Sequence, residues 1–438
     1  MSFYGSAAES LASSSSSLFI SSSSPSSPEM GAVDDWEIPH SQNDRQYILV
    51  IGGLGYIGSH TTLELLKEGY NVIVLDDLSN SYELTLSRIR TLAETHFKQV
   101  GGTVPTLQMY SMDYRSPRMR SVLTRYSVSN EVSATGFSSL DNATAPRSAI
   151  AGVIHFAAFK SVEESIHSPL SYYQNNVCGL VDLLVLLKEF GITNFVFSSS
   201  ATVYGDKANI GIPLTESDLV HHPEVYTDEN GNERLRMTGA NGLTSPYGRT
   251  KYFSEAILAD AAKADDSWKI CALRYFNPVG CHESGLLGED PRQKPTNLFP
   301  VVTRVLQDPS TTLGIFGSDW DTADGTAVRD FIHVVDLARG HISAMAAILN
   351  NKMDQSFTAY NLGTGKGSSV AEVVDSLERV TGQKIAVHRV GRRAGDVGLC
   401  VAATAFAERH LGWRAEKTLD ECARDTWNYV CKTKAIKA

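Results

Sequence analysis

Short apolar runs that end in glycine or aspartate alternate along most of the chain with segments of helical periodicity. Residues 47–51 form such a run before a glycine-rich turn, and residues 58–67 then carry leucines at helical spacing, with Gly69 as a stop signal. Residues 71–76 form a second apolar run and complete a strand–helix–strand unit. The same alternation recurs at residues 152–156, 177–187 and 194–197. Repeated strand–helix alternation predicts an α/β fold with a Rossmann-type doubly wound parallel sheet.

Three segments depart from this pattern. Residues 1–44 are rich in serine and contain no Lys or Arg, which is typical of a disordered tail and not of a signal or transit peptide. Residues 126–148 are polar and rich in Ser and Thr, and residues 207–245 carry Gly, Asn and charged residues. We expect both of these internal segments to be surface insertions.

Composition excludes several classes of function. Lys and Arg number 39 and Asp and Glu number 49, so the net charge is 39 − 49 = −10, which argues against a nucleic-acid-binding protein. No apolar run reaches the roughly 18 residues that a membrane span needs. The six cysteines are far apart and lack the spacing of a zinc site. We therefore expect no metal site, reduced thiols and a cytoplasmic location.

Glycines follow the first predicted strand at the spacing of a dinucleotide-binding turn. Gly53, Gly55 and Gly58 fit the pattern G-x-G-x-x-G between a strand and a helix, and Asp76 follows 18 residues after Gly58, at the end of the next strand. Such glycines let a pyrophosphate approach the backbone at the helix N-terminus, and Asp76 can accept hydrogen bonds from the adenosine ribose. Asp77 adds a second carboxylate and no Arg is present in this stretch, which favours NAD over NADP.

A tyrosine and a lysine four residues apart form the candidate catalytic pair. Ser245 and Pro246 are good N-cap and first-turn residues, so Tyr247 and Lys251 would share one face of a new helix. Tyrosine titrates near 10, and a nearby ammonium together with a positive nicotinamide would lower that pKa. The same spacing is common in surface pairs, and it is the upstream dinucleotide pattern that favours catalysis. Ser200 follows a predicted strand, where open α/β sheets bind ligands, and could hydrogen-bond the oxygen whose carbon is oxidised.

From about residue 47 to its end, apart from the two insertions, the chain resembles the extended short-chain dehydrogenase/reductase family, and within it the enzymes that epimerise C4 of UDP-glucose and UDP-galactose. The shared motifs occur in order at residues 52–60, 75–81, 153–160, 172–177, 197–205, 247–251, 274–280, 317–336, 360–367 and 392–396. The resemblance implies an NAD-dependent isomerase of galactose metabolism that acts through a 4-keto sugar. It also implies a homodimer formed through a helix bundle, with which the apolar helical face at 177–187 is compatible.

The resemblance implies a role for each matching residue. Tyr247 would be the base and acid, Lys251 its modulator and a ligand of the nicotinamide ribose, and Ser200 the polarising hydroxyl. The NAD site would be lined by Gly52, Gly55, Tyr56, Ile57, Gly58, Asp76, Asn80, Asp113, Phe156, Ala157, Lys160, Asn175, Tyr275 and Phe276. The UDP moiety would be held by Asn277, Asn297, Phe316, Arg329, Arg393 and Asp396.

The resemblance also divides the chain into domains. We predict an NAD-binding Rossmann domain at 45–275 and a smaller UDP-sugar-binding α/β domain at 276–438, of which part of 333–365 returns to the NAD-binding lobe. The chain departs from the family at Ile51, where Thr is usual, and at Asp77, where Asn is usual. The segment between Ser200 and Tyr247 is longer than in the family, so it must loop out for these two side chains to meet.

The breadth of the substrate range depends on Cys400. In the family, the position four residues after the Asp that corresponds to Asp396 limits the size of the sugar pocket. A small Cys would leave room for a C2 N-acetyl group, which leads to the hypothesis that UDP-GlcNAc and UDP-GalNAc are also interconverted. The alternative is that Cys400 is only a small buried residue.

Two other functions are compatible with parts of the pattern. A sugar-nucleotide 4,6-dehydratase or decarboxylase would share the fold, but a dehydratase usually has Asp-Glu where this chain has Ala201 and Thr202. A catalytically silent NAD-binding regulator tends to lose the Tyr or the Lys, and both are present here. The epimerase interpretation therefore explains more of the sequence than either alternative.

Overall fold

The computed structural model describes residues 46–437 apart from 129–146, 229, 291, 293–296, 309 and 394–395. The predicted tail at 1–44 lies outside the described residues, and so does most of the predicted insertion at 126–148. In the described part of the chain, none of the helices combines the length and the apolar character needed to cross a membrane.

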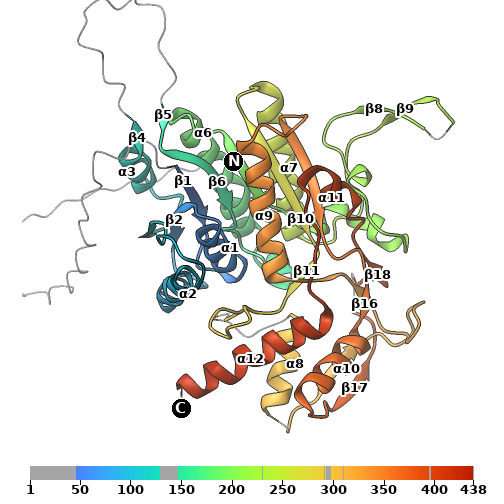
Figure 1. Cartoon of the computed structure of the whole chain (residues 1–438). Helices are drawn as coiled ribbons and strands as arrows, with labels where there is room; N and C mark the ends of the chain where they lie inside the picture. Colours follow the sequence, from blue (N-terminus) through green and yellow to red (C-terminus); the bar gives the residue numbers. More distant parts are fainter. Residues whose placement is uncertain are drawn as a thin grey trace, which may run out of the picture. The chain divides into compact units, whose positions relative to one another are not determined.

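Seven parallel strands form the central sheet (Figure 1). From one edge to the other they are β15 (Phe357–Leu362), β10 (Lys269–Tyr275), β7 (Asn194–Ser198), β6 (Ile150–His155), β1 (Tyr47–Ile51), β2 (Asn71–Asp76) and β3 (Leu107–Ser111). Chain order runs outward from β1 on one side and from β6 on the other, so the winding reverses between these two strands. The predicted doubly wound parallel sheet is confirmed, and its reversal point is where such sheets bind ligands.

Helices cover both faces of this sheet because side chains alternate along each strand. Ile48 and Val50 of β1 pack into one apolar cluster, whereas Leu49 and Ile51 pack into a second cluster on the opposite face. The first cluster includes residues of α1 (Tyr56–Lys67), α2 (Leu84–Val100) and α9 (Val334–Leu349). The second includes residues of α3 (Arg118–Arg125), α6 (Gly179–Glu189) and α7 (Pro246–Ala264).

A third apolar cluster joins elements from the last third of the chain. Its members come from α8 (Leu298–Gln307), β12 (Leu313–Phe316), β14 (Phe331–His333), α10 (Val370–Thr381) and α12 (Leu419–Lys437). In sequence, α9 and β15 lie between β14 and α10. Helix α9 packs on one face of the central sheet, and β15 joins the sheet by pairing with β10 in parallel. The division into an NAD-binding and a UDP-sugar-binding domain stays a prediction.

Short elements complete the fold. They are β4 (Ser127–Val128), β5 (Arg147–Ser148), α4 (Val162–His167), α5 (Pro169–Tyr173), the π-helical turn η1 (Gln174–Cys178), the 3-10 helices η2 (Ala201–Asn209) and η3 (Glu216–Asp218), β8 (Glu224–Thr227), β9 (Glu233–Arg236), β11 (Asn277–Val279), β13 (Val328–Arg329), β16 (Ser368–Ser369), β17 (Val387–Val390), β18 (Leu399–Cys400) and α11 (Ala405–Leu411).

The segment at 207–245 is only partly a surface feature. Its β8–β9 hairpin is exposed, as predicted for an insertion. Leu214, Leu219 and Val220, which precede the hairpin, are buried instead. The first part of this segment is therefore packed into the protein.

The apolar face predicted at 177–187 is largely internal. Leu180, Leu184 and Leu187 are buried in the apolar cluster on their side of the sheet, so they cannot face a partner subunit. The apolar residues that α6 exposes are Val181 and Val185. Any contact of α6 with a second subunit must use this other stripe of the helix.

Candidate active site

The glycine-rich turn brings backbone segments into close approach at the reversal point of the sheet. Gly52 has φ +79°, and a Cβ at this position would lie 2.9 Å from the backbone N of Ala157, which follows β6. A Cβ on Gly58 would lie 2.1 Å from the carbonyl O of Gly52. Only glycine fits these contacts. The N-cap residue of α1 is Gly55, so no side chain caps the helix and its first N–H groups can bind an anion.

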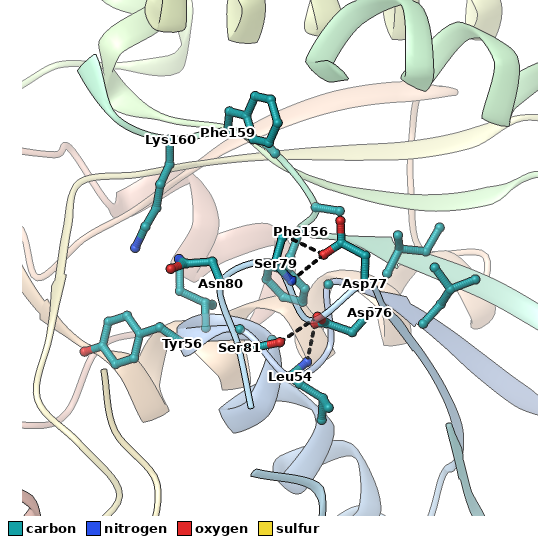
Figure 2. A pocket seen from close by; sticks show the side chains of 18 of the residues that line it. Leu54, Tyr56, Asp76, Asp77, Ser79, Asn80, Ser81, Phe156, Phe159 and Lys160 are labelled. Carbon is teal, nitrogen blue, oxygen red and sulfur yellow. Dashed lines mark hydrogen bonds between the residues drawn. The ribbon is translucent and has the colours of Figure 1, made fainter. Parts of the chain in front are cut away.

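Asp76 is held rigidly at the end of β2. Its Oδ2 accepts a hydrogen bond from the N–H of Leu54 at 2.9 Å, and its Oδ1 accepts one from the hydroxyl of Ser81 at 2.7 Å (Figure 2). The Oδ1 atom also accepts a hydrogen bond from the N–H of Leu78 at 3.0 Å. A carboxylate has about four lone-pair positions. At least one acceptor position therefore stays available for a ribose hydroxyl. The three hydrogen bonds within the chain fix the orientation of the carboxylate.

A single cavity collects the predicted cofactor residues. It is lined by Gly52, Gly55, Tyr56, Ile57, Gly58, Asp76, Asn80, Asp113, Phe156, Ala157, Lys160, Asn175 and Tyr275, together with Tyr247 and Lys251. Figure 2 shows the Lys160 side chain across the cavity from Asp76 and Ser81. Phe276 is the exception, because it is buried in a different apolar cluster with Tyr204 and Leu219 and is not among the described residues that line the cavity.

Tyr247 and Lys251 lie one turn apart at the start of α7, and both are buried. The helix begins as predicted: Pro246 is in its first turn, and the Ser245 hydroxyl accepts a hydrogen bond from a first-turn N–H at 3.1 Å. Ser200 lies two residues after the end of β7, and its hydroxyl is close enough to the Tyr247 phenol to lower the pKa of that phenol. The long segment between Ser200 and Tyr247 thus loops out and allows the two side chains to meet.

The chain's own groups raise the pKa of Tyr247, and the expected lowering by an ammonium together with a positive nicotinamide stays a prediction. Burial raises the pKa of this phenol well above its ordinary value, the nearby Tyr275 adds to the rise, and the Ser200 hydroxyl opposes it. The chain by itself therefore keeps Tyr247 protonated at neutral pH.

Lys251 is directed toward the end of β7 and not toward the phenol. Its Nζ donates to the carbonyl O of Ser198 at 2.6 Å and lies 4.7 Å from the centre of the Phe197 ring. Burial lowers the pKa of Lys251 to about 7, and the Glu255 carboxylate opposes this shift. The lysine is therefore poised to gain or lose its charge near neutral pH.

The residues predicted to hold the UDP moiety gather in the C-terminal part of the chain. Arg393 donates to Asp396 at 3.0 Å, and its guanidinium carbon lies 4.6 Å from the centre of the Phe316 ring. Arg329 and Cys400 are paired in the register of β13 and β18. The charges of Asp396 and Arg393 both affect the pKa of Arg329, so these three residues lie close together.

Arg329 has the features expected of an anion ligand. Burial lowers the pKa of its guanidinium, and among the described residues the side chain donates only to the carbonyl O of Val328, at 2.9 Å. A largely buried guanidinium with spare N–H groups is stabilised when an anion binds it.

Two further predicted residues lie beside the cavity and the C-terminal elements. Asn297 donates to Glu289 Oε1 at 3.2 Å, and Lys160 contacts the same oxygen at 3.3 Å. Asn277 lies at the start of β11, where its N–H donates to the carbonyl O of Asp330 at 3.0 Å. Glu289 thus connects a predicted cofactor residue with a predicted UDP residue.

Some residues of the site escaped the sequence analysis. Leu54 and Ser81 orient Asp76, and Glu289 and Tyr114 line the cavity. Leu54 and Ser81 lie within recognised motifs, but their partner becomes visible only in three dimensions. Glu289 lies in a stretch without any local pattern that could have indicated it.

The buried ammonium of Lys251 makes stability depend on pH. In the unfolded chain the lysine stays protonated to about pH 10, whereas the folded chain loses the proton near pH 7. The folded state therefore bears the full cost of the buried charge below pH 7, and this cost falls as pH rises to 10. We predict that the unfolding free energy of Lys251→Met minus that of the wild type decreases from pH 6 to pH 9.

Chemical denaturation at each pH measures this difference. Lys263→Met, which removes an exposed lysine of the same helix, is the matched control and should give a constant difference. A difference that stays constant for Lys251→Met as well would contradict the buried position of its ammonium.

Comparisons with known proteins agree with this site. The sequence model of the NAD dependent epimerase/dehydratase family matches residues 48–363. A UDP-glucose 4-epimerase of Haemophilus influenzae is 42% identical over 382 residues, which cover 87% of this chain and 96% of that protein.

Solved structures give the same result. A UDP-glucose 4-epimerase of Stenotrophomonas maltophila, with bound NAD and formylated UDP-arabinopyranose, is 35% identical with a TM-score of 0.74 and covers 90% of this chain and 100% of that one. A UDP-glucose 4-epimerase of Bifidobacterium longum, in complex with NAD+ and UDP, is 38% identical with a TM-score of 0.70 and covers 89% and 99%. The chain belongs to the NAD dependent epimerase/dehydratase family.

Proposed function

We propose that this protein is an NAD-dependent isomerase that interconverts UDP-glucose and UDP-galactose by inverting C4 through a 4-keto sugar. The observation that carries the proposal is that Tyr247 and Lys251 line the same cavity as the glycine-rich turn and Asp76. The family membership and the UDP-glucose 4-epimerases among its relatives support the same reaction.

The residues of the cavity fit NAD. Gly52 and Gly58 leave space at backbone atoms that a Cβ would fill, and α1 presents free N–H groups beside them. Asp76 and Asp77 offer carboxylates for ribose hydroxyls and would repel a 2′-phosphate, so NAD is preferred to NADP. When bound, NAD supplies the hydride acceptor for C4 and a positive charge that favours the phenolate.

Tyr247 would hold and return the proton of the sugar 4-hydroxyl. Because burial raises the pKa of this phenol, the proton can leave it only when positive charge is close. Lys251, one turn away, supplies part of that charge and can reach the nicotinamide ribose from the cavity wall. Ser200 donates to the sugar oxygen and orients it toward Tyr247. The burial of these side chains excludes water from the keto-sugar.

The UDP anchors must be strong, because the keto-sugar has to turn over between the two hydride transfers without leaving. We propose that Arg329 and Arg393 hold the pyrophosphate, which guanidinium groups bind in bidentate fashion. Asp396, Phe316, Asn277 and Asn297 would hold the rest of the UDP moiety. The pairing of Arg393 with Asp396 orders the guanidinium in advance.

We also propose that the sugar pocket accepts N-acetylated UDP-hexoses. Cys400 lies beside Arg329 in the sheet register, at the place where a larger side chain would narrow the space next to the pyrophosphate anchor. Burial raises the pKa of the Cys400 thiol to about 11, so the residue is a neutral thiol at physiological pH. Its effect on the substrate is therefore one of size.

We further propose that the protein is a homodimer in a reducing, cytoplasmic environment. Helices α4, α5, α6 and α7 expose Ile166, Leu170, Val185 and Phe253, and several of these helices pack on one another. A gathering of exposed apolar side chains on adjacent helices favours a protein–protein contact. The six cysteines, all within the described residues, are free thiols, which is typical of a reducing compartment.

The reaction can be tested with purified protein and UDP-galactose, without added NAD. We predict that UDP-glucose forms and that Tyr247→Phe lowers kcat by on the order of 100-fold or more, because a positioned acid–base group contributes about that much. The control is Tyr226→Phe in the β8 strand, which should retain full activity. A 4-keto-6-deoxy product would indicate a dehydratase, and the absence of turnover would indicate a regulator.

The sugar pocket can be tested by Cys400→Tyr. We predict that this substitution abolishes conversion of UDP-GlcNAc and leaves conversion of UDP-galactose within a few-fold of the wild type, because only the N-acetyl group needs the additional space. Cys400→Ser, which keeps the side chain small, should retain both activities. Equal loss of both activities in Cys400→Tyr would argue against a gate at this position.

The oligomeric state can be measured by light scattering coupled to size-exclusion chromatography. We predict a dimer for the wild type and a shift toward monomer for Val185→Asp, because a buried carboxylate destabilises an apolar contact. Val225→Asp, at an exposed position of β8, is the control and should stay dimeric. A monomeric wild type would disprove this part of the proposal.

A further inference from the structure

Glu255 is a buried acidic residue on the same helix as the candidate catalytic pair. It follows Lys251 by four residues, as Lys251 follows Tyr247, so all three side chains lie along one face of α7. Glu255 is 0% exposed. A fully buried carboxylate persists only where partners compensate its charge, and its partners therefore indicate what it holds in place.

On one side, Glu255 holds the serine run that follows β7. The Ser199 hydroxyl donates to Glu255 Oε1. Ser199 lies between Ser198, whose carbonyl O accepts a hydrogen bond from the Lys251 ammonium at 2.6 Å, and Ser200, whose hydroxyl is close enough to Tyr247 to lower the pKa of its phenol. The carboxylate thus fixes the middle residue of a run of three serines, of which the first binds Lys251 and the last lies near Tyr247.

On the other side, Glu255 holds a segment that comes from the insertion at 207–245. Arg274 of β10 donates to both carboxylate oxygens, with Nη2 to Oε2 at 2.7 Å. The same guanidinium donates to the carbonyl O of Glu216 at 3.2 Å and of Leu219 at 3.1 Å. His221 completes the set, with its Nε2 2.9 Å from Glu255 Oε2.

The ring of His221 is buried beside the Glu255 carboxylate. Its side chain is 3% exposed and packs against Tyr252 and Phe357. A carboxylate oxygen can only accept here, so Nε2 carries the proton and donates. Nδ1 has no hydrogen-bond partner among the described residues, so the contact with Glu255 is the one hydrogen bond of the ring within the described part of the chain.

We infer that His221 is a positioning residue of the proposed 4-epimerase reaction, which it serves through Glu255 by fixing the serine run that binds Lys251 and lies beside Tyr247. The inference rests on the proposed function. The inference gives the inserted segment at 207–245 a role in the active site, although the β8–β9 hairpin of this segment lies on the surface. Neither His221 nor Glu255 is among the described residues that line the cofactor cavity, so their effect on the reacting groups is indirect.

This position predicts which kinetic constant changes. His221 contacts neither the predicted UDP anchors nor the cavity wall, so substrate binding should not depend on it. Loss of its hydrogen bond would leave Oε2 of Glu255 held by Arg274 alone. The carboxylate would then hold Ser199 less firmly, and the serine run that binds Lys251 would be less fixed. The proton and hydride transfers need these groups held in place, so kcat should fall while KM stays.

The test compares two substitutions at position 221 by turnover of UDP-galactose. His221→Phe keeps a ring of similar shape against Tyr252 and removes the donor, whereas His221→Gln keeps an N–H donor at nearly the place of Nε2. We expect His221→Phe to lower kcat about tenfold with KM for UDP-galactose within twofold, as for a lost hydrogen bond to a charged group. His221→Gln should restore kcat to within about threefold of the wild type.

His222→Gln is the matched control, because this neighbouring side chain is part-exposed and pairs with Asp260 at 3.6 Å. Thermal unfolding of each variant shows whether the fold is kept. The inference is overturned if His221→Phe retains the wild-type kcat, or if His221→Gln is as impaired as His221→Phe. Absence of turnover in the wild-type protein would instead contradict the proposed function, and this inference with it.

Discussion

The arrangement of the site depends on the buried ion pair between Glu255 of α7 and Arg274 of β10. Arg274 is 1% exposed and donates to both oxygens of the carboxylate, so each charge is almost wholly removed from water. Removal of one partner from such a pair costs about 3–5 kcal/mol, because the other charge is left uncompensated. The pair therefore locks the helix that carries Tyr247 and Lys251 against the end of the sheet.

The same burial sets the electrostatics of the reacting groups. It lowers the pKa of Lys251 to about 7 and raises that of Tyr247, since both charged forms are disfavoured away from water. Without a ligand, Tyr247 is therefore protonated and neutral at neutral pH, and Lys251, one turn away, is about equally protonated and deprotonated. In the proposed reaction, the positive charge of NAD would shift this balance toward the phenolate and couple the acid–base function of Tyr247 to occupancy of the cofactor site.

The reversal of the sheet between β1 and β6 brings the other components to the same place. The glycine turn after β1 and the loop after β6 touch through Gly52 and Ala157, and the end of β7 presents Ser198 and Ser200 next to them along the sheet edge. Parallel strands end at the same edge, so residues from these three separate segments meet there. Glu289 then links this edge to the C-terminal elements through Lys160 and Asn297.

Features that depend on neighbours along the chain could be predicted from the amino-acid sequence. The period of apolar residues predicted the parallel sheet, the glycine spacing predicted the turn before α1, and Ser245 and Pro246 predicted the start of α7 and the shared face of Tyr247 and Lys251. These features follow from local sterics and hydrogen bonding, which a short stretch of sequence fully specifies.

Features that join distant segments could not be predicted and became visible only in the folded structure. It buried Leu180 and Leu184 in the chain's own core, although helical periodicity could not say which side of α6 faces the sheet. It directed the ammonium of Lys251 to Ser198, placed Phe276 away from the cavity, and joined residues 221, 255 and 274 into one buried network. The physical reason is that burial and charge compensation are set by groups tens of residues apart, and their effects on pKa and packing exist only after the chain has folded around them.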